Sequence, residues 1–173
     1  MAKPVAVTTV LRRQDPPAEG LNRIRPSMTG ERAERFVVLN LRLMAVGFAI
    51  TGFFFIAWPD GTLARLTELG GHLGFDTPAP KTDERLWLSL GFAYMVVITF
   101  LAWIASIDVV RYRPMILALA AGKAASSITS LIYFVEDDVF VYLLNGVVDG
   151  SLVFASLLLW SLAGRVGSPA APP

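Results

Sequence analysis

The 173-residue sequence contains no cysteine, a single histidine and few charged residues. Without cysteine, the chain cannot form disulfide bonds, thiolate nucleophiles or thiolate metal sites. Charged residues make up 17% of the chain, whereas about 25% is usual in soluble domains. The 15 basic and 14 acidic residues nearly cancel, so no overall electrostatic field favours nucleic acid. We therefore expect no thiol chemistry and no nucleic-acid partner.

The sequence also lacks the short motifs that accompany familiar catalytic sites. Neither the Gly-x-Ser-x-Gly nucleophile motif nor the His-Glu-x-x-His zinc motif occurs in the chain. The segment 122–124 is not a phosphate-binding loop, because Leu117 occupies the position of the first glycine and Ala124 that of the serine or threonine. His72 and the acidic run 136–138 are expected to be solvated. We therefore expect no catalytic residue, no metal ion and no cofactor.

Long apolar runs are what the sequence has instead, with 54% hydrophobic residues and a mean hydropathy of +0.57. Four apolar stretches occupy residues 36–58, 86–107, 115–135 and 139–163. About 20 helical residues cross a hydrocarbon core of about 30 Å, and lipid offers no partner to backbone groups outside a helix or barrel. The sequence therefore predicts an all-α membrane protein, built as a four-transmembrane-helix bundle with a polar N-terminal tail.

The predicted transmembrane domain covers residues 29–164, between a disordered cytoplasmic tail at 1–28 and a disordered C-terminal tail at 165–173. The four transmembrane helices are predicted at about 30–58, 86–108, 114–135 and 139–164. Between the first two, Asp60 is the expected N-cap of a short helix. That short helix is expected to lie flat on the outer surface of the membrane.

Basic residues are distributed unevenly between the two sides of the predicted bundle. Ten flank the ends on the side of the two termini, and three flank the other ends. The positive-inside rule therefore places both termini in the cytoplasm. Trp58 and Trp87 fall near the outer boundary, and Trp103 and Trp160 near the inner one, as in the aromatic belts of membrane proteins.

Two charged residues interrupt the apolar stretches near their middles, Lys123 in the third and Asp149 in the fourth. At 1.5 Å per residue, Lys123 lies about 12 Å from the inner boundary and Asp149 about 15 Å from the outer one. The two helices are antiparallel and joined by a very short turn, so both charges reach nearly the same depth. A charge near the bilayer centre costs roughly 2.5–3.5 kcal/mol, and pairing lowers this cost. We therefore predict a buried Lys123–Asp149 pair.

Small and polar residues accompany this pair and predict a polar seam between the third and fourth helices. Small residues spaced four apart let helices approach closely in lipid. The glycines expected in this packing are Gly122, Gly146 and Gly150. The other members of the predicted seam are Asn145, Ser126, Ser127 and Ser130. Two interpretations remain open: a clamp that fixes the register of two helices, or a site that binds a polar head group or moves a proton.

A second polar group lies near the cytoplasmic end of the bundle. Arg42 is about 9 Å inside the first apolar stretch and is expected to extend its side chain back to the interface. Contact with Asp108, or with a lipid phosphate, is the alternative. Asn40 lies beside Arg42 and is assigned to the same interfacial group.

A pattern of short segments extends over residues 36–163. The segments are 47–59, 69–70, 90–94, 113–114, 122–123 and 149–150. The pattern resembles that of small bacterial four-helix membrane proteins, broadly the DoxX-like group. The resemblance implies a four-helix bundle in the bacterial cytoplasmic (inner) membrane, and it transfers no catalytic residue. The long proline-containing N-terminal tail departs from the compact pattern.

The predicted function is that of a non-enzymatic accessory or scaffolding subunit. Its expected partners are the lipid bilayer and another membrane protein. The alternative is a small carrier or a proton-linked membrane component that uses Lys123 and Asp149. A membrane enzyme ranks third, because the sequence shows no nucleophile, metal cluster or acid–base constellation.

Overall fold

The computed structural model describes residues 28–80 and 85–166, which form five helices and no strands. The helices are α1 (Met28–Ala57), α2 (Pro59–His72), α3 (Arg85–Ala105), α4 (Arg113–Asp137) and α5 (Phe140–Val166). All but α2 are long and apolar enough to cross a membrane. The prediction of an all-α chain with four helices of membrane-spanning length is therefore confirmed. The predicted tails lie outside the described residues, except for Met28, Arg165 and Val166.

The helices differ from their predicted bounds by a few residues at each end. Met28, assigned to the N-terminal tail, already belongs to α1, and Arg165 and Val166, assigned to the C-terminal tail, belong to α5. The second long helix ends at Ala105 and not at residue 108. Its end is displaced because the Asp108 carboxylate accepts a hydrogen bond from the backbone N–H of Arg111 at 2.9 Å, which stabilises a turn.

The turn between α4 and α5 is tighter than predicted, because α4 continues through most of the acidic run. The helix ends at Asp137, and the next residue, Asp138, caps it with a φ of 53° in the left-handed region. Aspartate adopts this conformation more readily than most residues do. The Asp138 N–H donates to the Phe134 carbonyl oxygen at 2.9 Å, and α5 begins at Phe140. The two helices therefore run antiparallel with almost no connecting chain.

The boundary between α1 and α2 is a sharp bend rather than a loop. Trp58 has non-helical dihedral angles (φ −149°, ψ 59°), and Pro59 is the first residue of α2. Proline is well suited to this position, because the N–H that it lacks would have no partner within the helix. The prediction that Asp60 is the N-cap was wrong, since Asp60 lies within the first turn. A Cβ atom at Gly61 would lie 2.1 Å from the Trp58 indole, so a larger residue there would displace the Trp58 side chain.

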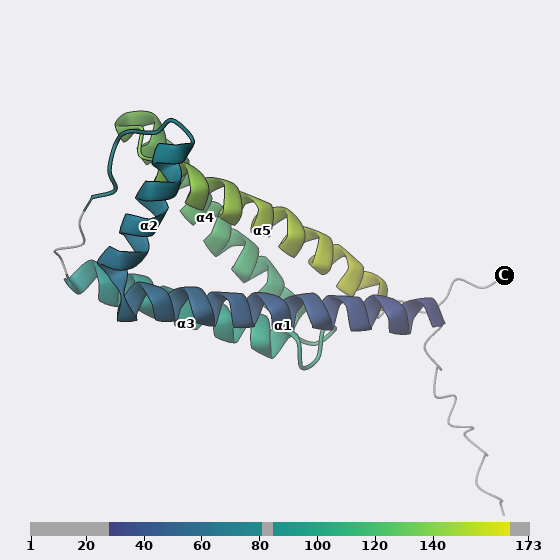
Figure 1. Cartoon of the computed structure of the whole chain (residues 1–173). Coiled ribbons are helices and arrows are strands. Elements are labelled where there is room, and N and C mark those ends of the chain that lie inside the picture. The colour runs from purple at the N-terminus through teal and green to yellow at the C-terminus, as the bar shows by residue number, and fades with distance from the viewer. Residues whose placement is uncertain (1–27, 81–84, 167–173) are drawn as a thin grey trace, which may run out of the picture.

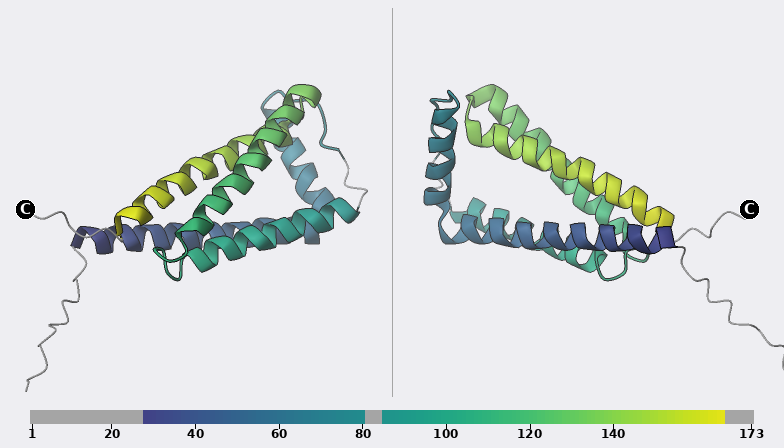
Figure 2. Two further views of the ribbon diagram at one scale, coloured as in Figure 1. Left: turned by 180° about the vertical axis from the view of Figure 1, so that it is seen from behind. Right: turned by 45° about the vertical axis from the view of Figure 1, so that its right-hand side comes forward.

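The long helices form two layers of two. Helix α1 packs against α3, and α4 packs against α5. Figure 1 shows that the layers meet near the start of α1 and the end of α5 and diverge toward the opposite end of the molecule. Helix α2 spans the wide end, from the end of α1 to the turn between α4 and α5, and the views in Figure 2 show the same wedge. The molecule is therefore narrow at one end and open at the other.

Buried apolar side chains fill the narrow part of the wedge. One cluster, at the narrow end, consists of Val37, Leu41, Ala105, Val109, Ile116, Leu159 and Ala163. A second, farther along the helices, consists of Ala45, Phe48, Ile98, Ala102 and Leu119. Both clusters draw residues from the α1–α3 layer and from the other layer. The two layers are therefore joined at the narrow end and in the middle.

Helix α2 is fixed at its far end by contact with the α4–α5 turn. Gly70 is buried, and a Cβ atom there would lie 2.7 Å from the Cβ atom of Phe140. The Phe75 ring, just after α2, lies 5.3 Å from the Phe140 ring and 6.0 Å from the Phe134 ring, centre to centre. These contacts connect the wide ends of the two layers through α2.

The outward faces of the long helices are apolar. Large side chains such as Phe53, Phe100 and Phe154 are more than half exposed, at 62%, 58% and 78%. An apolar surface of this extent is unfavourable in water, whereas lipid solvates it. The surface and the helix lengths together are those of a multi-pass membrane protein.

Candidate functional site

The structure brings Lys123 of α4 and Asp149 of α5 together in the interior. Lys123 Nζ donates to Asp149 Oδ1 at 2.8 Å, and the two residues are 4% and 3% exposed. The antiparallel pairing of the two helices through the short 138–139 turn gives both residues the same depth. Removing two charges from water is costly, and close pairing recovers part of that cost only when both partners are present. Each charge therefore depends on the other.

The predicted seam residues lie around this pair, along the contact between α4 and α5. The Ser127 hydroxyl donates to the Gly146 carbonyl oxygen at 2.7 Å. The Asn145 amide Nδ2 donates to the hydroxyl oxygen of Ser130 at 2.8 Å and to that of Ser126 at 3.3 Å. These bonds stabilise one register of the two helices.

The three glycines of the predicted seam do not share one partner. A Cβ atom at Gly146 would lie 2.7 Å from the Leu131 side chain, and one at Gly150 would lie 3.1 Å from Ser127 Oγ, so both face α4. Gly122 instead faces α3, where a Cβ atom would lie 3.2 Å from the Tyr94 hydroxyl. The assignment of Gly122 to the α4–α5 contact was therefore wrong, because spacing along one helix does not reveal which neighbour its small residues meet.

Two aromatic residues complete the surroundings of Lys123, and neither was predicted from the sequence. Lys123 Nζ lies 4.8 Å from the centre of the Phe48 ring and 5.7 Å from that of the Tyr94 ring. A cation over an aromatic face is stabilised by the ring quadrupole. The Tyr94 hydroxyl is buried and has no hydrogen-bond partner within the described part of the chain. Neither residue stands out in sequence, because both lie in uniformly apolar stretches.

A cavity of about 370 Å³ lies beside the pair, walled by all four long helices. Its polar wall consists of Thr51, Tyr94, Lys123, Ser126, Asn145 and Asp149. Clefts that hold small ligands usually have volumes of about 300–1,000 Å³ and mostly apolar walls with a few polar groups. The cavity matches both criteria.

The apolar wall of this cavity is rich in aromatic rings. It includes Phe48 and Phe55 from α1 and Trp87 and Phe92 from α3. Phe55 and Trp87 belong to the ends of α1 and α3 at the wide side of the wedge, whereas Lys123 and Asp149 lie near the middles of their helices. The cavity therefore extends from the buried pair toward the end of the bundle where α2 lies.

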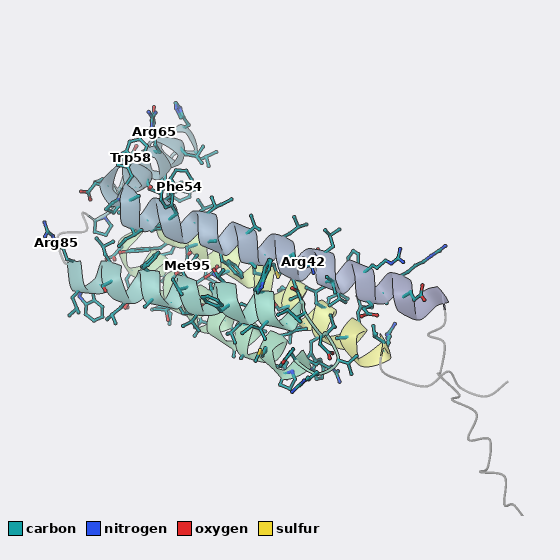
Figure 3. All side chains as sticks on the ribbon, turned by 90° about the horizontal axis from the view of Figure 1, so that it is seen from below. Arg42, Phe54, Trp58, Arg65, Arg85 and Met95 are labelled. Atoms are coloured by element: carbon teal, nitrogen blue, oxygen red, sulfur yellow. The ribbon has the colours of Figure 1, made fainter. Side chains whose placement is uncertain are left out.

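The predicted interfacial residues do not form one group. The Arg42 guanidinium lies 6.0 Å from the centre of the Trp103 ring, and Figure 3 shows Arg42 on the α1–α3 layer together with Met95. Asn40 Nδ2 donates to the Phe36 carbonyl oxygen within α1 at 2.8 Å. Asp108 is engaged in its own turn, and the described residues show no ion pair between Arg42 and Asp108.

Arg113 joins the start of α4 to the end of α5, a contact that was not predicted from the sequence. Its Nε donates to the Trp160 carbonyl oxygen at 2.9 Å, and its guanidinium lies 4.0 Å from the centre of the Trp160 ring. A Cβ atom at Gly164 would lie 2.7 Å from this guanidinium. The α4–α5 pair is thus connected by Arg113 at the narrow end and by the Lys123–Asp149 pair in the middle.

The described residues include no group of three or more His, Asp or Glu side chains placed to hold a metal ion. His72 is exposed at the end of α2, and Glu136 and Asp137 are exposed at the end of α4. The chain matches no protein-family model, no curated protein and no solved structure. The resemblance to the DoxX-like group therefore stays a prediction.

Proposed function

We propose that this chain is a four-span membrane protein that binds a small amphipathic molecule in the cavity beside Lys123 and Asp149, in the manner of a carrier. The observation that supports this proposal is the cavity itself, whose wall combines a buried ion pair with aromatic rings. A clamp between two helices would account for the pair but not for an adjoining space of about 370 Å³. An intramembrane charged pair is also a usual mark of a substrate or ion pathway.

The proposal includes a location and an orientation. We place the chain in the bacterial cytoplasmic membrane with both termini in the cytoplasm, because basic residues are concentrated on the side of the termini. In that orientation α2 lies at the outer surface, and the wide end of the cavity faces the outer leaflet. The accessory or scaffolding role inferred from the sequence concerns a partner protein, and it stays a separate prediction.

Gly91 provides a test, because it lines the cavity and a Cβ atom there would have no neighbour within 4 Å. We expect Gly91→Leu to fill cavity space without disturbing helix packing. Gly47→Leu is the matched control, because Gly47 also has no neighbour within 4 Å and does not line the cavity.

The full chain and both variants would be purified from the native membrane in mild detergent, and bound small molecules identified by mass spectrometry. We expect one molecule, in about equal amount to the protein, in the wild type and in Gly47→Leu, and its depletion in Gly91→Leu. Equal amounts of every copurified molecule in all three proteins, or none in any, would contradict the proposal.

A further inference from the structure

The Lys123–Asp149 pair uses only part of its own hydrogen-bonding capacity. An ammonium group has three N–H donors, and within the described residues one of them is directed at Asp149 Oδ1, at 2.8 Å. The other near neighbours of Nζ are the ring faces of Phe48 and Tyr94, which accept no conventional hydrogen bond. In the same part of the chain, Asp149 Oδ2 receives no hydrogen bond. A donor and an acceptor therefore stay unused side by side in the wall of the cavity.

A hydroxyl group is the simplest ligand group that complements both. It donates one hydrogen bond, here to Asp149 Oδ2, and accepts another, here from Lys123 Nζ. A carbonyl group would satisfy the ammonium but would leave Oδ2 unpaired, and unpaired buried acceptors are unfavourable.

Charge balance excludes most ionic ligands. The pair already carries one positive and one negative charge, and the other polar groups of the wall, on Thr51, Tyr94, Ser126 and Asn145, are uncharged hydroxyl or amide groups. A charged ligand group would add a third charge without a counter-charge in apolar surroundings, where it is poorly tolerated. A neutral polar group leaves the balance unchanged.

We propose that the molecule bound in this cavity is an uncharged amphiphile with a hydroxyl group, and that Lys123 and Asp149 together recognise the hydroxyl. This inference rests on the proposed function, because it names the class of ligand for the same cavity. The apolar part of the molecule contacts the aromatic wall formed by Phe55, Trp87 and Phe92. The hydroxyl lies near the middle of the bundle, and the apolar part extends toward α2.

Trp87 supplies an optical test, because bromine atoms quench tryptophan fluorescence on contact. Three brominated probes of equal chain length would be titrated into the full-length protein in lipid nanodiscs: a long-chain alcohol, an alkyl sulfonate and an alkyl trimethylammonium. The contribution of Trp87 to the quenching is obtained as the difference between the wild type and the Trp87→Phe variant. We expect the alcohol to reach half-maximal quenching at a concentration at least about tenfold lower than either charged probe.

Three further proteins make the outcomes distinct. The alcohol signal should persist in Gly47→Leu and disappear in Gly91→Leu, and the preference for the alcohol should disappear in the double variant Lys123→Met/Asp149→Leu. If all three probes quench Trp87 equally and Gly91→Leu abolishes the signal, the cavity binds amphiphiles but the hydroxyl inference is overturned. It is also overturned if the double variant keeps the preference. Quenching that Gly91→Leu leaves unchanged for every probe would overturn the proposed function as well.

Discussion

At the scale of single residues, the strongest dependence in the molecule is that of Lys123 and Asp149 on each other. Both side chains are nearly inaccessible, and each has the other as its counter-charge at 2.8 Å. In surroundings of low polarity, a charge that loses its partner keeps its desolvation cost and loses its compensation. The ring faces of Phe48 and Tyr94 offer Lys123 a weaker, partial substitute.

The first prediction follows from this dependence. Lys123→Met or Asp149→Leu alone should lower the free energy of unfolding by about 3–5 kcal/mol, because either leaves one buried charge unpaired. The double variant should be about as stable as the wild type or more stable. Denaturant unfolding of the wild type, the two single variants and the double variant in detergent would give the coupling free energy between Lys123 and Asp149. Additive losses in the double variant would show that the two charges do not stabilise each other.

Gly70 and Gly71 give the second prediction, since these consecutive residues of α2 have opposite surroundings. A Cβ atom at Gly70 would lie 2.7 Å from Phe140 Cβ, whereas one at Gly71 would have no neighbour within 4 Å. Gly70→Ala should therefore cost about 1–3 kcal/mol by forcing the contact apart. Gly71→Ala should raise stability by up to about 1 kcal/mol through helix propensity. Thermal unfolding of both variants in detergent would measure the difference, and equal shifts would contradict the docking of α2 on α5.

At the scale of the helices, the sequence correctly predicted features that depend on one helix or on two consecutive helices. It did not predict the contacts made where three or four helices pack together. The existence of the four long helices follows from apolar length. The Lys123–Asp149 contact was predictable because the two residues lie at similar distances from the membrane boundaries, on two helices joined by a short turn. The observed helix ends differ from the predicted ones where a local hydrogen bond stabilises the end. Asp108 and Asp138 form such bonds after α3 and α4.

The cavity could not be predicted, because the sequence does not show which faces of the two helix pairs meet. In a soluble bundle, polar positions mark the outside. Here the outward faces and the core are both apolar, so Phe48, which lies against Lys123, has the same appearance in sequence as Phe53, which faces outward. The position of Gly122 against Tyr94 of α3, and not against α5, was mispredicted for the same reason.

At the scale of the whole molecule, the described part of the chain begins and ends at the same end of the bundle, since the start of α1 and the end of α5 both lie at the narrow end (Figure 1). Since the chain has no cysteine, single cysteines introduced at chosen positions would be the only thiols in the protein. Thr77, in the segment after α2, and Arg111, in the turn between α3 and α4, are both exposed. They lie at opposite ends of the bundle.

Labelling with a membrane-impermeant maleimide gives the third prediction. In intact bacterial cells, Thr77→Cys should react and Arg111→Cys should not, because the proposed orientation, based on the excess of basic residues, places the Arg111 side in the cytoplasm. Arg111→Cys should react only after the membrane is disrupted. The reverse pattern would invert the proposed orientation, and labelling of both positions in intact cells would contradict the four-span topology.

The divergence of the two helix layers also matters for the lipid around the molecule. A body that widens from one end to the other occupies more area in one leaflet than in the other, and here the larger area belongs to the leaflet next to α2 (Figure 2). Molecules inserted in a single orientation would therefore expand that leaflet relative to its counterpart. In the proposed membrane location, their combined effect would be to favour a bulge toward the α2 side, so the shape of this small protein would bear on the curvature of the membrane that holds it.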